Sequence, residues 1–567
     1  AGLDRFDSVA HDRRVREYAA ADDAFRHEWV TSGPAELLRA RGGSGMSFSG
    51  RSTGALAREL QKTRGRLGTR AILRKYSEAV QSLTPIVLAS PAAAVDLIEP
   101  GVIQFDLAIF DEASQIAVPE AIGAIGRAKA VVVVGDSKQM PPTKRVGATP
   151  SGEDEYEESD ADEVIEDQES ILSECELARV PTLRLSWHYR SQDEALIAFS
   201  NQAYYMGALS SFPTPTLLSN VTGVEFRRVD GQYFRSSKDR PGGAALDLGH
   251  NVTAGANTNP VEALAIVRAV VDLIDASPDG KPSVGVVTFN EQQRTLIEDL
   301  LGASPDPRVG VLLDEAVMGP TEVLFVKALE QVQGDERDVI LFSVAFSKQA
   351  NGKIPLNFGR LSNLGGERRL NVAVTRARRK NLVFCSFDPR ELEAERSSYA
   401  GVKDLKRFLE FAQSADEAKP EATLTVDRLP VRDRHRDCVA DALRERGLHV
   451  LSDVGLSDFR LDLVLARSDQ PERLVLPVLL DGTSWHRRRT VSDRDVLPVE
   501  VLRNLMGWPD VARVWWPMWL QNRQLAVNTL VAAFEEADAR LTERDTAATA
   551  DEGAPPGDVT PQPAGFD

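Results

Sequence analysis

Two adjacent carboxylates, Asp111 and Glu112, follow a short apolar run at residues 107–110. Such a run is typical of a buried parallel strand, and open α/β sheets bind their ligands at the carboxyl ends of parallel strands. An aspartate at this place can hold Mg²⁺, because hard cations prefer oxygen ligands. The glutamate beside it can orient and deprotonate a water molecule aimed at a phosphate. Acidic pairs at strand ends also cap helices, so the pair is interpreted together with its neighbours.

A second apolar run at residues 131–134 lies about one helix length downstream, so the two runs predict a βαβ unit. It leads into the sequence GDSKQMPP, which begins at Gly135. Within it, Asp136 follows the strand, and Gln139 lies one turn later, where an amide could sense the terminal phosphate of a nucleotide. The two runs therefore predict a nucleotide site at one edge of a parallel sheet, with Asp136 and Gln139 among its residues.

The two segments, in this order, resemble motifs of the superfamily 1 helicases. DEAS at 111–114 is similar to their Walker B motif, and GDSKQMPP to their third motif. LSWHYRS at 185–191 resembles the motif that opens the second RecA-like domain. QGDERD at 333–338 and RRLNVAVTRAR at 368–378 resemble the fifth and sixth motifs. The resemblance covers residues 80–390 and implies two RecA-like P-loop NTPase domains that bind ATP and Mg²⁺ between them.

The resemblance also gives roles to single residues in the first of these domains. Asp111 would help to hold Mg²⁺, Glu112 would activate water, and Gln139 would couple to the γ-phosphate. Asp136 would belong to the same nucleotide site.

Further roles fall in the second domain. Arg190 and Arg376 would be arginine fingers that stabilise the transition state, with Arg378 as a further candidate. Gly334 would let the backbone approach a ligand closely, and Glu336 would bond a sugar hydroxyl or a neighbour of the phosphate. The alternatives are a surface salt bridge for each arginine and an ordinary polar turn for QGDERD.

Two segments are candidates for contact with nucleic acid. Residues 86–90 predict a strand, which resembles a helicase segment that contacts nucleic acid but could equally be a plain core strand. The family often has Thr-Pro-Tyr-x-x-Gln after a later strand. This chain keeps Thr288 and Gln293 but has Phe289 and Asn290 at the other two places. The basic stretch at 51–75 could follow a phosphate backbone or form a solvated helix face.

A superfamily 1 ATPase also needs a phosphate loop upstream of Asp111. The printed chain has no GxxxxGK[ST], since Lys281 is followed by Pro282 and Lys353 by Ile354. Few strands precede Asp111 as well. We therefore expect the first RecA-like domain to be incomplete in this chain, with its phosphate loop upstream of Ala1, and we expect the chain alone not to hydrolyse ATP. The alternative is a degenerate ATPase.

The C-terminal part shows a different pattern. An alternating run at 458–465 carries Asp462, and a second run at 474–480 ends in Asp481, with His486 shortly after it. A hairpin with acids near both strands resembles the core of restriction-endonuclease-like folds, in which Mg²⁺ activates water. The segment resembles the very-short-patch-repair endonucleases and their helicase-fused relatives.

This second resemblance implies Asp462 as the central metal ligand, Asp481 as a second ligand and His486 as a general base. The chain departs from the pattern at Leu479, where relatives often carry an acid. The alternative is a degenerate nuclease fold that only binds DNA or packs against its neighbours.

Composition sets the broad class. The length suits about three or four domains. The net charge of −18 disfavours polyanions on average, yet binding needs only a local basic groove. Three cysteines without a CxxC pattern argue against a zinc site and a disulfide framework and favour the cytoplasm. No apolar run approaches the ~20 residues of a membrane span.

The predicted fold class is α/β, with two RecA-like domains, the first incomplete, followed by a small restriction-endonuclease-like α/β domain. Residues 210–259 show no sustained period and are expected to be irregular. The predicted parts are a helical insertion or spacer (1–80), the end of RecA-like domain 1 (81–150), an acidic loop and connector (151–180), RecA-like domain 2 (181–410), a linker (411–423), the endonuclease-like domain (424–545) and a disordered tail (546–567).

These predictions describe an ATP-dependent superfamily 1 helicase or translocase that acts on nucleic acid, with a C-terminal Mg²⁺-dependent nuclease-like domain. The nuclease likeness favours DNA over RNA. Two other classes stay open. One is an ATPase that senses or remodels nucleic acid and carries a binding-only nuclease fold. The other is a non-catalytic nucleic-acid-binding scaffold.

Overall fold

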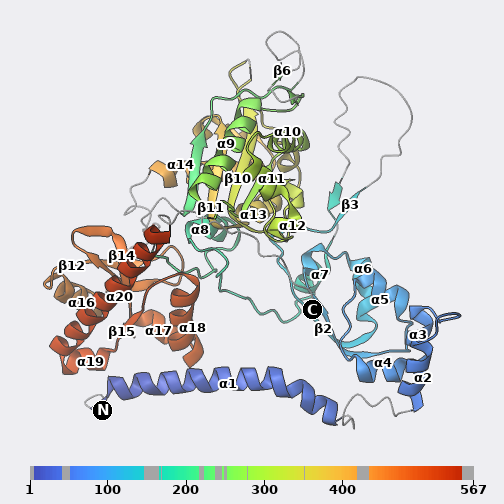
Figure 1. Ribbon diagram of the computed structural model, residues 1–567, viewed down its shortest axis with the longest axis horizontal. Coiled ribbons are helices and arrows are strands. Elements are labelled where there is room, and N and C mark those ends of the chain that lie inside the picture. The colour runs from blue at the N-terminus through green and yellow to red at the C-terminus, as the bar shows by residue number, and fades with distance from the viewer. Residues whose placement is uncertain are drawn as a thin grey trace, which may run out of the picture. The chain divides into compact units, whose positions relative to one another are not determined.

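The fold is seen in a computed structural model (Figure 1). It forms two compact units, Tyr18–Leu185 and a second unit of Ala1–Glu17 with Ser186–Asp567, which are treated in turn. None of the described helices is long and apolar enough to cross a membrane. The described residues are 5–40, 51–145, 165–167, 169–215, 222–235, 246–247, 252–277, 279–349, 351–417 and 433–551.

The first unit begins with helices, as its charged and helical sequence predicts. A small core of Leu56, Ile72 and Ala79 holds the short helices together. The strand predicted at 86–90 is wrong: these residues form no strand, and the side chain of Leu88 is 94% exposed. The helices are α1 (Ser8–Ala40, which starts in the other unit), α2 (Arg51–Leu60), α3 (Thr69–Lys75), α4 (Ser77–Leu83) and α5 (Pro91–Leu97).

The predicted βαβ unit is present in this first unit. Strand β1 (Phe105–Phe110) leads through a 3-10 turn to α6 (Val118–Ile125) and then to β2 (Ala128–Val133), which lies parallel to β1. Helix α7 (Ile171–Leu177) packs against this pair of strands. The prediction that β1 is buried is wrong, because its sheet has two strands and Ile109 is 65% exposed. We name the part formed by β1, α6, β2 and α7 the two-stranded domain. A short antiparallel pair, β3 (Thr143–Arg145) and β4 (Ile165–Asp167), follows in the chain.

The second unit contains a parallel sheet in the order β5-β11-β10-β8-β9. We name residues 186–417 the five-stranded domain (Figure 1). Its edge strand β5 falls in the stretch 210–259 that was expected to be irregular, and that expectation is wrong there. The strands are β5 (Gly223–Arg228), β6 (Leu246–Asp247), β7 (Thr253–Ala254), β8 (Val284–Thr288), β9 (Phe325–Ala328), β10 (Arg337–Ser347) and β11 (Ala377–Ser386).

Helices cover both faces of this sheet, which is why its central strands are apolar on both sides. All five residues of β8 are buried. On β10, Leu341 packs into the core under α9 and α10, while the next residue, Phe342, faces Phe408 of α14. The helices are α8 (Ala195–Tyr204), α9 (Pro260–Ala276), α10 (Glu291–Gly302), α11 (Pro307–Leu313), α12 (Glu315–Met318), α13 (Gly366–Val374) and α14 (Ala400–Glu417).

Residues 433–551 form a separate small sheet in the order β12-β13-β14-β15, which we name the C-terminal domain. The predicted hairpin is present, because β13 and β14 pair antiparallel, and β15 joins them parallel. Helix α20 continues to Asp551, into the predicted tail. Its elements are α16 (Arg434–Arg444), β12 (Leu448–Val454), β13 (Leu461–Arg467), β14 (Gln470–Leu480), α17 (Thr483–Arg487), a helical segment (492–505, with α18 at Leu497–Glu500), β15 (Ala512–Val514), α19 (Trp516–Gln521) and α20 (Arg523–Asp551).

The alternation of side chains along β13 builds two cores on opposite faces of this sheet. Leu463 and Leu465 face one core, which includes residues of α16 and α20. Val464 and Ala466 face the other core, which also contains Phe212 of the five-stranded domain. The C-terminal domain therefore shares a hydrophobic core with the domain before it.

Candidate functional site

The carboxyl end of β1 carries the predicted acidic pair. Glu112 has a left-handed backbone, with φ of 50°, a conformation that costs a non-glycine residue of the order of 1 kcal/mol or more. Its N–H donates to Asp111 Oδ1 at 3.0 Å, and Gln115 Nε2 donates to Glu112 Oε2 at 3.4 Å. Both acidic side chains are exposed. The turn thus presents two carboxylates to solvent at the end of a parallel strand.

The turn after β2 lies against this acidic turn. Ala113 N–H donates to Val134 O at 2.9 Å, so the strand ladder continues into both turns. Gly135 permits the close approach, since a Cβ there would lie 3.0 Å from Ser114 N. Asp136 accepts hydrogen bonds from Lys138 N at 2.9 Å and from Gln139 Nε2 at 3.0 Å.

The fold therefore brings together the two turns that hold Asp111, Glu112, Asp136 and Gln139. Asp136 fixes the Gln139 turn within its own segment.

In the five-stranded domain, Arg190 and Glu336 are brought together. Arg190 Nε lies 2.8 Å from Glu336 Oε2, and both side chains are nearly half exposed. Glu336 also faces Arg378 Nη1 at 3.7 Å. Arg378 in turn pairs with Asp338 at 2.6 Å and with Glu322 at 3.1 Å. The segments that resemble motifs of the same family therefore meet through charged side chains.

Arg376 differs from Arg190 in its surroundings. It is 4% exposed, and its Nε donates to Val372 O of α13 at 2.8 Å. Both Arg190 and Arg376 act on His188, a residue that sequence reasoning did not single out. Burial, together with the positive charges of the two arginines, lowers the pKa of His188 to about 4. His188 is hydrogen-bonded to Ser191 Oγ at 2.9 Å. The sequence feature that could have identified His188 is its position within the motif that contains Arg190.

Two other predicted contacts have different environments. Gly334 has φ of 89°, and no atom lies within 4 Å of where a Cβ would be, so its flank is open to a ligand. Gln293 is fully buried, and its amide donates to Asn259 O at 3.2 Å and Ser343 Oγ at 3.1 Å. Thr288 is fully buried as well. Contact of these last two side chains with nucleic acid is therefore not supported.

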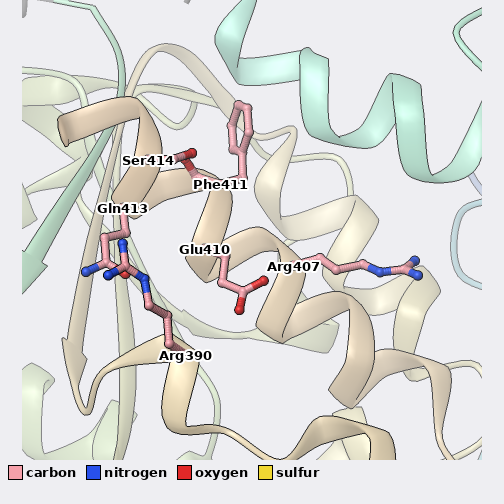
Figure 2. A pocket seen from close by; sticks show the side chains of 6 residues that line it. All are labelled: Arg390, Arg407, Glu410, Phe411, Gln413 and Ser414. Atoms are coloured by element: carbon pink, nitrogen blue, oxygen red, sulfur yellow. The ribbon is translucent and has the colours of Figure 1, made fainter. Parts of the chain in front are cut away.

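An open cavity of about 420 Å³ lies on α14, away from these residues (Figure 2). The arginines on it come from two elements, Arg407 from α14 and Arg390 from the turn before it. Figure 2 shows Arg407 projecting away from Arg390, so the two guanidinium groups do not converge on one ligand. We assign it no chemical role. Its lining residues are Arg390, Arg407, Glu410, Phe411, Gln413 and Ser414.

In the C-terminal domain, Asp462 lies near the start of β13. Its Oδ2 accepts a hydrogen bond from Leu480 N of β14 at 2.7 Å. Burial raises its pKa to about 6. Leu479, where the sequence departs from the expected endonuclease pattern, is buried. Asp462 is therefore tied to its own sheet, without an acidic neighbour at that position.

Cationic side chains surround Asp462. Arg436 and Arg513 lower its pKa, and Arg488 also interacts with it. Arg513 is largely buried, and its Nη1 lies 3.3 Å from Asp495. The guanidinium of Arg488 stacks on a neighbouring phenylalanine ring, 4.7 Å from its centroid.

Asp481 and His486 complete the predicted metal set. Asp481 Oδ1 accepts from Trp516 N at 2.7 Å, and its charge acts on Arg513 together with that of Asp462. His486 is exposed, with its ring 5.0 Å from that of Trp485. Among the described residues, no group of three or more His, Cys, Asp or Glu is placed to hold a metal. Each of the two aspartates accepts a main-chain N–H group on one oxygen, and the charge of Arg513 interacts with both.

The start of the chain packs on the C-terminal domain, which sequence reasoning missed. Trp515 Nε1 donates to Asp12 Oδ1 at 2.8 Å, and the ring of His11 meets the ring of Trp515 edge-on at 4.5 Å. Gln521 Nε2 donates to Phe6 O at 3.1 Å. The charge of Asp12 also acts on Arg513. No pattern within residues 5–17 could reveal a partner about 500 residues away.

Comparison with known families defines the class of protein. Models described as AAA domains match residues 46–144 and 168–388, and a restriction-endonuclease model, REase_MTES_1575, matches residues 436–534. The chain thus matches AAA-domain models over the two stretches that hold the predicted helicase motifs, and a restriction-endonuclease model after them, in the order that its motifs predict.

Individual relatives agree with this class. The chain is 29% identical to an uncharacterized ATP-dependent helicase, MG140, of Mycoplasma genitalium over 60% of this chain and 28% of that protein. It is 25% identical to the DNA replication ATP-dependent helicase/nuclease DNA2 of Bos taurus over 49% of this chain and 24% of that protein. For the probable helicase senataxin of Mus musculus, identity is 26% over 54% of this chain and 10% of that protein. The chain thus spans about a quarter or less of the length of these relatives.

Proposed function

We propose that the intact protein is an ATP-dependent helicase or translocase that acts on nucleic acid. The observation that carries this proposal is the pair of adjoining turns at the ends of β1 and β2, with Asp111, Glu112 and Gln139. Carboxylates and an amide at the ends of parallel strands suit a nucleotide with its Mg²⁺. The helicase relatives support the same reading.

Each residue then has a definite task. ATP would supply the phosphoryl group whose hydrolysis drives movement along the strand. Asp111 would hold Mg²⁺ through its exposed carboxylate, and Glu112 would accept the proton of the attacking water. Gln139 would report on the γ-phosphate. Arg190 and Arg376 would stabilise the negative charge that develops there.

The test uses the intact protein. Changing Glu112 to Gln keeps the size of the side chain but removes its basicity. We expect ATP turnover to fall by at least about 100-fold while nucleotide binding stays intact. Glu120→Gln is the matched control, because Glu120 is an exposed glutamate on the adjacent helix α6. Unchanged turnover in Glu112→Gln would refute its role.

For the C-terminal domain we favour the second candidate, a nucleic-acid-binding role without metal-dependent cleavage. The specific observation is that Arg436, Arg488 and Arg513 interact electrostatically with Asp462, and that the guanidinium of Arg488 lies over the ring of Phe459. Arginine suits the phosphate backbone, and Asp462 would then serve to orient these groups. A Mg²⁺-dependent nuclease is the first candidate predicted from the sequence.

One assay separates these two candidates. The chain is incubated with single- and double-stranded DNA and Mg²⁺ or Mn²⁺, beside an Asp462→Ala variant, and both binding and cleavage are measured. We expect binding without cleavage. Cleavage that disappears in Asp462→Ala would establish the nuclease instead.

We also propose DNA as the substrate and the cytoplasm as the compartment. The named activity of the DNA2 relative and the endonuclease-like domain favour DNA. The three thiols of Cys175, Cys385 and Cys438 are free, which suits a reducing compartment. Competition between DNA and RNA oligonucleotides for the intact protein tests the first point, with RNA preference as the contradicting result. Cell fractionation tests the second.

A further inference from the structure

The C-terminal domain is built onto the segment that carries Arg190. Trp187, three residues before Arg190, forms a strand-like bridge with Ser210. Its ring lies 5.0 Å from that of Phe212, and Phe212 lies 4.4 Å from Phe459 of the C-terminal domain. Phe212 and Phe459 are almost fully buried. An aromatic stack therefore runs from the arginine segment into the C-terminal domain.

Hydrogen bonds close this contact on both sides. Trp508 Nε1 donates to Pro213 O at 2.8 Å, and Trp508 is 1% exposed. Ser211 N donates to Ser457 Oγ at 2.9 Å, and Ser457 Oγ donates to Ser211 O at 3.1 Å. Buried main-chain and indole groups are costly to leave without partners. The contact between the two domains is therefore packed and hydrogen-bonded like the interior of a single domain.

Glu194 ties the same contact to the arginine segment. It lies four residues after Arg190, is 1% exposed, and accepts from Ser211 Oγ at 2.7 Å and from Leu456 N at 3.1 Å. One carboxyl group thus holds a loop of the C-terminal domain against the start of α8. We name the contacts of Phe212, Phe459, Trp508 and Glu194 the seam.

The far side of the seam reaches the candidate site of the C-terminal domain. The guanidinium of Arg488 stacks on the ring of Phe459, 4.7 Å from its centroid. Arg488 also interacts electrostatically with Asp462. A displacement of Phe459 would therefore move a cation at that site. Contiguous packed side chains with a shared core are the physical means by which two sites can bias each other.

We propose that the seam couples the position of the arginine segment to the phosphate-binding surface of the C-terminal domain, with Phe459 and Glu194 as positioning residues. The binding of nucleic acid at Arg488 would then affect the nucleotide-dependent position of Arg190, and the reverse would also hold. The seam that joins the two domains would transmit both effects. This proposal rests on the proposed function, which gives Arg190 its role at the nucleotide. By linkage, the effect must be equal in both directions.

Hydrogen exchange of this chain tests the coupling without nucleotide or DNA. The amides of His188 and Gln192 are bonded to Ser210 O and Arg378 O and report on the arginine segment. We expect Phe459→Ala to speed their exchange by about tenfold or more, since the packing that holds the segment is lost. Unchanged exchange would overturn the proposal.

A matched control separates the seam from general damage. Phe534 is a similarly buried phenylalanine, in the other core of the C-terminal domain. Phe534→Ala should weaken that domain without changing exchange at 187–192. Equal acceleration in both variants would mean that loss of the C-terminal fold, and not the seam, causes the effect, and would also overturn the proposal.

A second measurement does not depend on an alanine variant that folds. A protease site is inserted between residues 418 and 432 of the full chain, and the cut protein is examined by gel filtration. We expect the two fragments to elute together even after residues 1–17, which also contact the C-terminal domain, have been deleted. Separation of these fragments would refute the seam. The Glu112→Gln test can fail independently of either result.

Discussion

A buried glutamate in the five-stranded domain gives a quantitative prediction. Glu262 is fully buried at the start of α9 and accepts from Ser343 Oγ at 2.8 Å, Ala345 N at 2.6 Å and Ser386 Oγ at 2.7 Å. Ala345 has φ of 66°, a left-handed conformation within β10, where the register with β11 shifts. The Glu262 carboxyl group therefore holds an irregular point of the central strand.

The pKa of Glu262 makes this support depend on pH. Burial raises the pKa from 4.5 to about 7, against the effect of the three hydrogen bonds. The unfolded chain therefore binds fewer protons than the folded one between these values, and the free energy of unfolding falls as pH rises. The full gap corresponds to about 3 kcal/mol, most of which falls between pH 5 and pH 8.

Changing Glu262 to Gln removes this titration. At pH 5 we expect the variant to be less stable by about 1 kcal/mol, because the Ser386 hydroxyl loses its acceptor. At pH 8 we expect it to be more stable than the unaltered chain by about 1–2 kcal/mol, because no charge is buried. Urea unfolding of both proteins at pH 5, 6, 7 and 8 measures the difference.

The control for this prediction is Glu315→Gln, at an exposed glutamate of the same domain. Its difference from the unaltered chain shows how much of any pH effect comes from removing an exposed carboxyl group. Other buried acids, such as Glu194, titrate equally in the Glu262 variant and the unaltered chain, so they cancel. A difference for Glu262→Gln that is the same at pH 5 and pH 8 would refute the reasoning.

Two further predictions concern packing. Gly135→Ala should destabilise the two-stranded domain by about 1–3 kcal/mol, because the new Cβ would lie 3.0 Å from Ser114 N, whereas Gly68→Ala, with no atom within 4 Å, should not. Urea midpoints decide this, and equal midpoints would contradict it. Asp12→Ala should cost about 1–2 kcal/mol, because Trp515 Nε1 loses its acceptor. Faster hydrogen exchange at residues 8–17 is the expected signal, and unchanged exchange would show that the contact is not formed.

The sequence predicted the elements that depend on local pattern. The apolar runs at 107–110 and 131–134 form the parallel strands β1 and β2, and the hairpin around Asp462 is present. Periodicity sufficed because the side-chain repeat of a strand or helix is a local property of the chain. The acidic pair and Gln139 could be placed together for the same reason, since parallel strands align their ends.

Burial and long-range contacts could not be predicted in this way. An apolar run indicates a strand but not whether anything covers it, and Ile109 of β1 is exposed. The run at 86–90 has strand-like residues, yet its backbone finds no partner strand. The pairing of Arg190 with Glu336 joins residues 146 positions apart, and that of Asp12 with Trp515 joins residues 503 positions apart. Such contacts arise from the packed fold and leave no local period in the sequence.

The three candidate arginines can be ranked by the interactions that each would lose on moving to a nucleotide. Arg378 is held by Glu322 and Asp338, and Arg376 is buried against a helix carbonyl. Arg190 forms an ion pair with Glu336, in which the two side chains are 44% and 40% exposed. An exposed pair of this kind is worth about 0–1 kcal/mol, while breaking a buried or multiple pairing costs several times as much. If the proposed function holds, a γ-phosphate would replace Glu336 as the partner of Arg190 at little cost, and we expect Arg190, rather than Arg376 or Arg378, to move onto the nucleotide.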